Sequence, residues 1–164
     1  MAGYGTDQGF TDWLAANGLS LPVGAPAVAI LREVGSNYVD GAYEPGLSCS
    51  KRTGGFAQDR AWPRVGHTVQ CEVVPSSLIP QAWILASYRA AYLQAVSGWA
   101  QGGTDPTRVT KREKVDVLEV EYFASGDGAA AGNAAAGFPV DPLIDGWVSI
   151  WLCSKARSIG FLVV

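Results

Sequence analysis

The chain has 164 residues and a formal net charge of −3, and only 16% of its residues are charged against 48% that are apolar. This length suits one domain with one core, and the negative net charge excludes a global positive field that would attract nucleic acid. Average soluble domains carry about 25% charged residues, so a surface this poor in charge favours burial against other protein, with an ordinary aromatic-rich core as the alternative.

Two helices are predicted in the first quarter of the chain. Thr11–Gly18 predicts a short helix that Thr11 can cap and that Asn17-Gly18 can end. Ala27–Tyr43 predicts a second helix, with Pro26 at a position suited to a helix start. Gly35 lowers its helix propensity, but its apolar residues recur at helical spacing. These residues are Val28, Leu31, Val34 and Tyr38.

Leu47–Pro75 is predicted to be a long irregular connection, and such loops are usually functional or disordered. It holds the chain's one local basic excess, in which a single acid, Asp59, faces four basic residues. These are Lys51, Arg52, Arg60 and Arg64. Two interpretations of Trp62 stay open. Either Trp62 plugs the core beneath the loop, or it anchors a loop that presents Arg60 and Arg64 to a partner.

The strongest helix signal runs from about Leu78 to Trp99, after a potential cap at Ser76-Ser77 and with Pro80 in its first turn. Apolar side chains surround this helix on nearly every side, and such a helix is buried on nearly every side. Because one small domain has few other helices, a neighbouring subunit is expected to cover part of it. The residues expected at that interface are Trp83, Tyr88, Tyr92 and Trp99.

The segment Thr107–Phe123 predicts a β-hairpin with a basic first arm and a second arm that alternates acidic and apolar residues. Opposed arms of opposite charge support each other across the strand pair. Residues 108–121 hold four bases and four acids, so the hairpin is dipolar and not a phosphate track. Ser125–Gly137 follows as a low-complexity segment.

A final short helix is predicted over Pro142–Cys153, with Trp147, Ile150 and Trp151 on its apolar face. Residues 1–153 then form one domain and residues 154–164 a C-terminal tail, which ends in an apolar, β-prone stretch. That stretch either packs on its own domain as a last strand or adds as a strand to another protein. The expected fold class is mainly α, a small bundle of three to four helices with one β-hairpin, a long irregular loop and an extended C-terminal tail.

Residues suited to catalysis or metal binding are few. Cys49, Cys71 and Cys153 lie far apart without a CxxC motif, which is typical of reduced thiols in a cytoplasmic product and offers no metal-ligand spacing. The single histidine, His67, has no nucleophile motif beside it and is expected at the surface. No enzymatic activity, cofactor or metal is therefore expected. The N-terminus lacks the pattern of a signal peptide, and no membrane span is expected.

Two strings carry a resemblance to a known family: Gln58-Asp-Arg-Ala-Trp-Pro-Arg64 and Thr110-Lys-Arg-Glu-Lys-Val-Asp-Val-Leu-Glu-Val-Glu-Tyr122. In that order, with a helix between them, they resemble tailed-phage virion proteins, the head-tail connectors or adaptors. These proteins are often labelled "putative DnaT-like single-stranded-DNA-binding protein". The resemblance spans residues 6–152. The chain departs from it at the hairpin turn, where the family often has a Gly-Pro-like turn.

The resemblance implies a structural protein of the virion neck, assembled in the host cytoplasm and without catalysis. Such proteins form a homo-oligomeric ring, dodecameric in the family, that docks under the portal protein. The ring also meets a downstream neck or tail protein and continues the channel for double-stranded DNA. The alternative function, which the label proposes, is a single-stranded-DNA-binding module that acts in phage replication.

The resemblance also suggests roles for two groups of residues. The basic loop residues Lys51, Arg52, Arg60 and Arg64 are expected to contact acidic groups of a neighbouring subunit or partner, with channel DNA as the weaker option. Connector proteins commonly grip the portal with their termini, so the tail is expected to dock there. The docking residues are Phe161, Leu162, Val163 and Val164.

Overall fold

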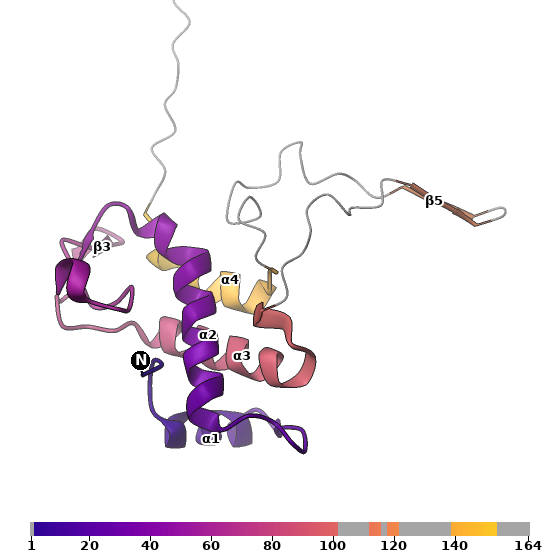
Figure 1. Ribbon diagram of the computed structural model, residues 1–164. Coiled ribbons are helices and arrows are strands. Elements are labelled where there is room, and N and C mark those ends of the chain that lie inside the picture. Colours follow the sequence, from indigo (N-terminus) through magenta and orange to yellow (C-terminus); the bar gives the residue numbers. More distant parts are fainter. Residues whose placement is uncertain (1, 102–111, 116–117, 122–138, 154–164) are drawn as a thin grey trace, which may run out of the picture.

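The computed structural model describes residues 2–101, 112–115, 118–121 and 139–153 (Figure 1). Four α-helices lie in these residues, together with three small two-stranded antiparallel sheets, so the fold is mainly α as predicted. The helices are α1 (Asp7–Ala16), α2 (Val28–Tyr43), α3 (Gln81–Ser97) and α4 (Pro142–Val148). Short 3-10 turns follow α2, α3 and α4, namely η1 (Glu44–Leu47), η3 (Trp99–Gln101) and η6 (Ser149–Trp151). A fourth, η2 (Gly55–Ala57), lies in the connection between α2 and α3.

The ends of the first helix are fixed by local chemistry, and one of them differs from the prediction. α1 begins earlier than predicted because Thr6, and not Thr11, is its cap. The Thr6 hydroxyl accepts a hydrogen bond from the Gly9 amide at 2.9 Å. The predicted end at Asn17-Gly18 is confirmed, with Gly18 in the left-handed region at φ +64°.

The second and third helices lie where they were predicted. α2 starts one residue after the predicted start and ends at the predicted residue. α3 is shorter than predicted at both ends, because its cap is Pro80 and Gly98 ends it in the left-handed region. Ser76-Ser77 therefore lies outside the helix and does not cap it.

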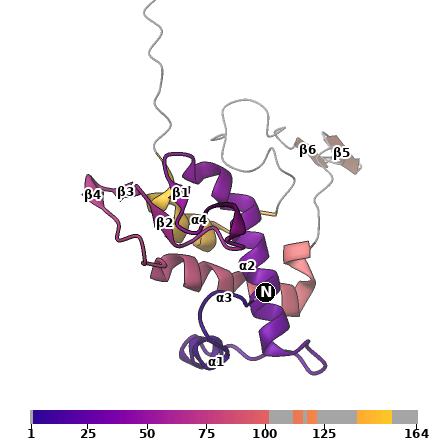
Figure 2. The ribbon, with the colours of Figure 1, turned by 60° about the vertical axis from the view of Figure 1, so that its left-hand side comes forward.

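α2 and α3 cross at very close range, as both views of the ribbon show (Figures 1 and 2). A Cβ atom on Gly35 would lie 2.2 Å from the Ser87 carbonyl oxygen and 2.7 Å from the Ala91 amide nitrogen. Ser36, Ser87 and Ala91 around this crossing are fully buried. The glycine that lowers the helix propensity of α2 is thus required by the close approach of the two backbones.

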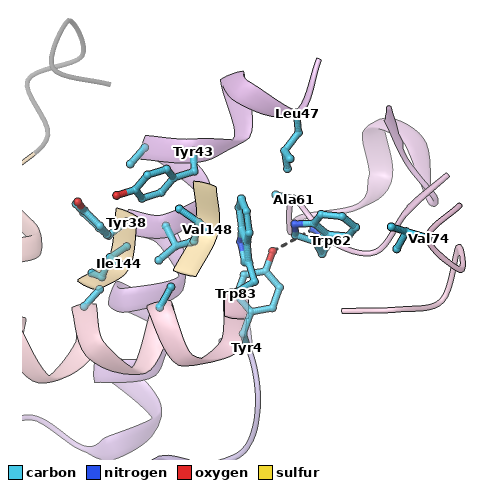
Figure 3. Close-up of a cluster of buried hydrophobic side chains, with 14 residues drawn as sticks. Tyr4, Tyr38, Tyr43, Leu47, Ala61, Trp62, Val74, Trp83, Ile144 and Val148 are labelled. Atoms are coloured by element: carbon cyan, nitrogen blue, oxygen red, sulfur yellow. Dashed lines mark hydrogen bonds between the residues drawn. The ribbon is translucent and has the colours of Figure 1, made fainter. Parts of the chain in front are cut away.

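Other helices of the same chain cover most of α3. On one side Tyr88 and Ala91 pack with residues of α1 and α2, which are Phe10, Leu14 and Leu31. On another side Trp83 joins the larger core between α2, α3 and α4 (Figure 3). α1, α2 and α4 of the same chain therefore bury the central turns of α3, which is more cover than was expected from one small domain, and a contact of a neighbouring subunit with the rest of the helix stays a prediction.

The four residues expected at a subunit interface have different environments. The structure places Trp83 and Tyr88 in the interior of the chain's own fold, with 0% and 4% exposure. Tyr92 and Trp99 are half-buried and pack at the edges of the two clusters. That Tyr92 or Trp99 takes part in a subunit contact stays a prediction.

The long connection between α2 and α3 contains four short strands that the sequence did not predict. β1 (Lys51–Arg52) pairs with β2 (Arg64–Val65), and β3 (Thr68–Val69) pairs with β4 (Glu72–Val73). The turn between β3 and β4 holds Gln70 and Cys71 at φ 50° and 68°. Positive φ at both central residues is the requirement of a type I′ hairpin turn.

The C-terminal half confirms one predicted element and modifies another. β5 (Arg112–Val115) and β6 (Leu118–Glu121) pair antiparallel, as predicted for this segment. α4 is shorter than the predicted helix, and its buried face consists of Ile144 and Val148, while Ile150 is exposed. The predictions for residues 125–137 and for the tail, 154–164, lie outside the described residues, so the proposed division at residue 153 stays a prediction.

Membrane-spanning helices were searched for in the same described residues. None of the helices there is both long enough and apolar enough to cross a bilayer.

The close crossing of α2 and α3 generates a paired test. Gly35→Ala should lower the free energy of unfolding by about 1–3 kcal/mol, because the new methyl group meets backbone atoms and overpacks the crossing. Gly146→Ala is the matched control, since a Cβ there meets nothing within 4 Å. It should raise stability by up to about 1 kcal/mol through helix propensity alone. Urea unfolding of both variants measures the difference, and equal effects would contradict the crossing geometry.

Candidate functional site in the arginine-rich loop

The loop between α2 and α3 carries the four basic residues that were predicted to contact a partner. Arg52, on β1, faces Glu44 at the end of α2 in a two-pronged ion pair. Its Nε donates to Glu44 Oε1 at 2.7 Å and its Nη2 to Oε2 at 2.5 Å. Its Nη1 donates to the carbonyl oxygen of Gln58 at 2.5 Å. This fork geometry is the strong form of an arginine–carboxylate interaction.

Arg64, on β2, is almost completely buried and uses every donor of its guanidinium group inside the fold. Nη1 donates to Glu44 Oε1 at 3.2 Å and to the Ala61 carbonyl at 3.0 Å. Nη2 donates to the carbonyls of Leu47 and Ser50, and Nε donates to the Ser50 hydroxyl at 2.7 Å. A guanidinium group has five N–H donors, so Arg64 has none left for an outside partner.

Arg60 connects the loop to the N-terminal segment and to α2. Its Nε donates to the carbonyl oxygen of Ala2 at 3.1 Å, and its Nη1 donates to Asn37 Oδ1 at 2.7 Å. The same nitrogen lies 3.6 Å from Asp40 Oδ2. Of the four predicted contact residues, Lys51 is the one whose side chain is exposed. That these four residues contact a partner stays a prediction. For the three arginines, binding to a partner would compete with the contacts that they make inside the fold.

Asp40 of α2 is the buried acceptor on which three other segments of the chain converge. Its Oδ1 accepts from the Tyr4 hydroxyl at 2.8 Å and from Trp83 Nε1 at 3.0 Å, and its Oδ2 accepts from the Ala61 amide at 3.3 Å. The Tyr4 hydroxyl in turn accepts from the Trp62 amide, the contact dashed in Figure 3. Burial raises the pKa of Asp40, and the bonds from Trp83 and Tyr4 oppose that shift.

Trp62 fills the core beneath the loop. It is 1% exposed, and its ring packs edge to face with Trp83, His67 and Trp151 at centroid distances of 5.9, 4.9 and 5.7 Å. This confirms the interpretation of Trp62 as a core plug. The loop thus lies on the core through Trp62 and turns its arginines inward.

His67 was expected at the surface, and that expectation was wrong, because the ring is 1% exposed and lies against Trp62. Its Nδ1 lies 2.9 Å from the Ser50 hydroxyl and 3.8 Å from Cys49 Sγ. Burial lowers the pKa of His67. The Trp151 backbone opposes this shift and the charge of Arg64 adds to it.

The expectation of separate reduced thiols was also wrong for two of the three cysteines. Cys49 and Cys153 form a disulfide with a Cα–Cα distance of 5.8 Å, while Cys71 is free and exposed. The fold also brings His67 to this pair, so that one ligand atom of each residue lies within 4.8 Å of the others. Sequence spacing gave no hint of this, because Cys49 and Cys153 are 104 residues apart.

The acceptors that hold the loop were the functional residues missed in the sequence. Asp40 and Glu44 stand four residues apart at the end of α2, and residues at that spacing share one face of a helix. A pair of acids on one face of α2, followed by a loop with four bases, was the available signal. It predicts internal neutralisation as readily as an outside partner.

Large apolar side chains are exposed along the same loop. Five of them lie between residues 56 and 79: Phe56, Val65, Val73, Leu78 and Ile79. Contiguous exposed apolar patches mark protein–protein contacts, so these side chains are candidates for such a contact. Polar side chains are also exposed in the same loop, including Lys51, Asp59 and Glu72.

A protein-family model described as "Putative DnaT-like ssDNA binding protein" matches residues 3–158. No curated protein and no solved structure matches the chain. The description names single-stranded DNA and does not mention a virion, so the connector assignment stays a prediction.

The Glu44 ion pairs generate a pH-dependent test. Hydrogen bonding from Arg52 holds the pKa of Glu44 below its usual range, against an opposing effect of burial, and Arg64 adds to the lowering. A carboxylate with a lowered folded-state pKa stabilises the fold above its unfolded pKa of about 4.3 and loses that contribution as the pH falls. Glu44→Gln should therefore be less stable than wild type at pH 7, and the difference should shrink below about pH 4.

The control for that test is Glu72→Gln, which removes an exposed acid from β4 in the same loop. Chemical unfolding of both variants at a series of pH values provides the measurement. A stability difference for Glu44→Gln that stays constant from pH 7 to pH 3 would contradict the role of the charged pair.

Proposed function

The chain belongs to the family of DnaT-like proteins, and we propose that it acts as a structural assembly protein, a subunit of a head-tail connector ring in a tailed-phage virion. Its function is then carried by contacts with copies of itself, with the portal protein and with a downstream neck or tail protein. Contacts of this kind close a ring when the rotation between neighbouring subunits allows it. DNA passes through the channel of such a ring without being the ligand that holds it together.

One observation carries this proposal: the arginines in residues 2–101 and 139–153 are paired inside the fold. Each of five arginines pairs with a carboxylate of the same chain, which leaves Lys51 as the remaining base in residues 2–101 and 139–153. The paired residues are Arg32, Arg52, Arg60, Arg64 and Arg89. Binding to a nucleic-acid backbone needs several cations that are available to neutralise phosphates. The described surface offers few of them.

The composition of the loop surface supports the same proposal. Its exposed side chains include Phe56 and Val73, together with the other apolar residues of that segment. Apolar and aromatic residues contribute most of the buried core of protein–protein interfaces. A protein that works by assembly gains affinity from such a surface, whereas a phosphate-binding protein does not.

Single-stranded-DNA binding is the second candidate, and the description of the family favours it. Lys51 and the basic arm of the hairpin would be its main cations. The register of the hairpin places Arg112 opposite Glu121 and Lys114 opposite Glu119. Bases that stand opposite acids give a dipolar ladder of low net charge, so this candidate has a weaker physical basis than the first.

The two functions predict different results for two variants of the loop. For a connector, wild-type protein should co-sediment with portal-containing heads. The double variant Phe56→Ser, Val73→Ser should lose this binding, because it removes two exposed apolar side chains. Lys51→Gln is the matched control, and it should keep the binding because it changes only charge.

Binding of a fluorescent oligo-dT to the same proteins tests the alternative. For a connector, anisotropy should show no specific affinity at physiological salt. A wild-type protein that binds oligo-dT with a steep salt dependence, weakened by Lys51→Gln, and that stays monomeric with portal-containing heads would contradict the proposal and favour single-strand binding.

A further inference from the structure

The disulfide-linked corner of the molecule has no role in the assembly proposed above, and it contains an unusual set of side chains. Cys49 follows η1, His67 lies between β2 and β3, and Cys153 follows η6 at the end of the described C-terminal segment. We propose that, when the disulfide is reduced, Cys49, Cys153 and His67 form a binding site for zinc or a similar borderline-soft divalent ion.

The distances suit three ligands of one metal ion. The three donor atoms lie within 4.8 Å of one another, and Cys49 Sγ is 3.8 Å from His67 Nδ1. Two ligands of a tetrahedral zinc ion are about 3.5 Å apart, given Zn–S near 2.3 Å and Zn–N near 2.0 Å. Once the S–S bond is broken, the two sulfur atoms need to move apart only to about 3.8 Å to reach the same geometry.

The surroundings hold the imidazole ring where a ligand would be needed. Edge-to-face packing on Trp62 fixes the plane of the His67 ring, and the Val74 amide donates to the His67 carbonyl at 2.9 Å. The nitrogen that faces the Cys49 sulfur is Nδ1, which is therefore the atom that would bind the ion.

The Ser50 hydroxyl contacts His67 Nδ1 at 2.9 Å, but the other hydrogen bonds of this hydroxyl do not need that contact. The Ser50 hydroxyl lies 3.2 Å from the Leu47 carbonyl, to which it can donate, and it accepts from Arg64 Nε at 2.7 Å. Both bonds remain when Nδ1 turns its lone pair to a metal ion.

Charge balance also favours a divalent ion here. Two thiolates cancel the charge of one zinc ion, so the loaded site is neutral and does not repel the nearby Arg64 guanidinium. Three protein ligands leave a fourth position, and the exposure of Cys49 allows water to fill it. Three protein ligands plus one open position are found in catalytic zinc sites, one class of which has two cysteines and one histidine.

Reduction of the disulfide and binding of the ion are two separate steps. A phosphine or dithiol reductant supplies two electrons, the Cys49–Cys153 bond breaks, and two protons give two thiols while the reductant is oxidised. Binding of one divalent ion then displaces up to two protons from the thiols. Re-oxidation by a disulfide oxidant removes two electrons from the thiolates, restores the S–S bond and releases the ion.

The test uses the full chain, reduced with a phosphine under nitrogen and titrated with Co²⁺ alone as a spectroscopic probe. The expected result is one equivalent of Co²⁺ bound, with thiolate-to-metal charge-transfer absorption that one equivalent of Zn²⁺ abolishes. The oxidised protein, titrated in the same way, should show no such absorption. This comparison of two redox states of the wild type does not depend on the folding of any variant.

Variants identify the ligands. Cys49→Ser and Cys153→Ser should each abolish the charge-transfer band. His67→Gln should weaken Co²⁺ binding by more than the roughly 10–100-fold that loss of an outer-shell partner costs. Cys71→Ser removes the exposed third cysteine and should leave binding unchanged. Absence of stoichiometric charge-transfer absorption in reduced wild type would show a structural disulfide only. Absorption that is lost in Cys71→Ser and kept in Cys49→Ser would equally overturn the proposal.

Discussion

Two carboxylates at the end of α2 hold the long loop on the helical core. Asp40 accepts hydrogen bonds from the N-terminal segment, from the loop and from α3, and it pairs with Arg60. One turn later, Glu44 pairs with both Arg52 and Arg64. An arginine left without its carboxylate in this partly buried loop would carry an uncompensated charge, which is strongly destabilising. Because the loop arginines are used in this way, its exposed apolar side chains, among them Phe56 and Val73, become the stronger candidates for recognition.

Features of the sequence that act over a few residues could be predicted. The end of α1 follows from Asn17-Gly18, and the extent of α2 follows from its apolar spacing. The pairing of β5 with β6 follows from the charge pattern of the two arms. Even here a local choice could fail. Thr6 and Thr11 are both acceptable caps, and the structure uses the earlier one because the N-terminal segment is fixed on α2 by Arg32.

The rest could not be predicted, because it depends on contacts between distant segments. Nothing in the spacing of Cys49 and Cys153 shows that η1 and η6 meet. The inward direction of Arg64 depends on carbonyl groups that only the folded loop brings together. The turn at Gln70-Cys71 takes a conformation that usually requires Asn or Gly. The sequence therefore drew attention to this loop but did not show that its arginines make their contacts inside the fold, and their role toward a partner stays a prediction.

We infer that the loop arginines serve the fold and are not available to a ligand. The most direct measurement is hydrogen exchange of the arginine Nε–H groups by NMR on protein with ¹⁵N-labelled arginine, with and without added oligo-dT. We expect slowly exchanging Nε–H signals for Arg52 and Arg64, whose Nε atoms donate to Glu44 and Ser50, and no change when oligo-dT is added. Rapidly exchanging signals that shift on addition of oligo-dT would contradict the account.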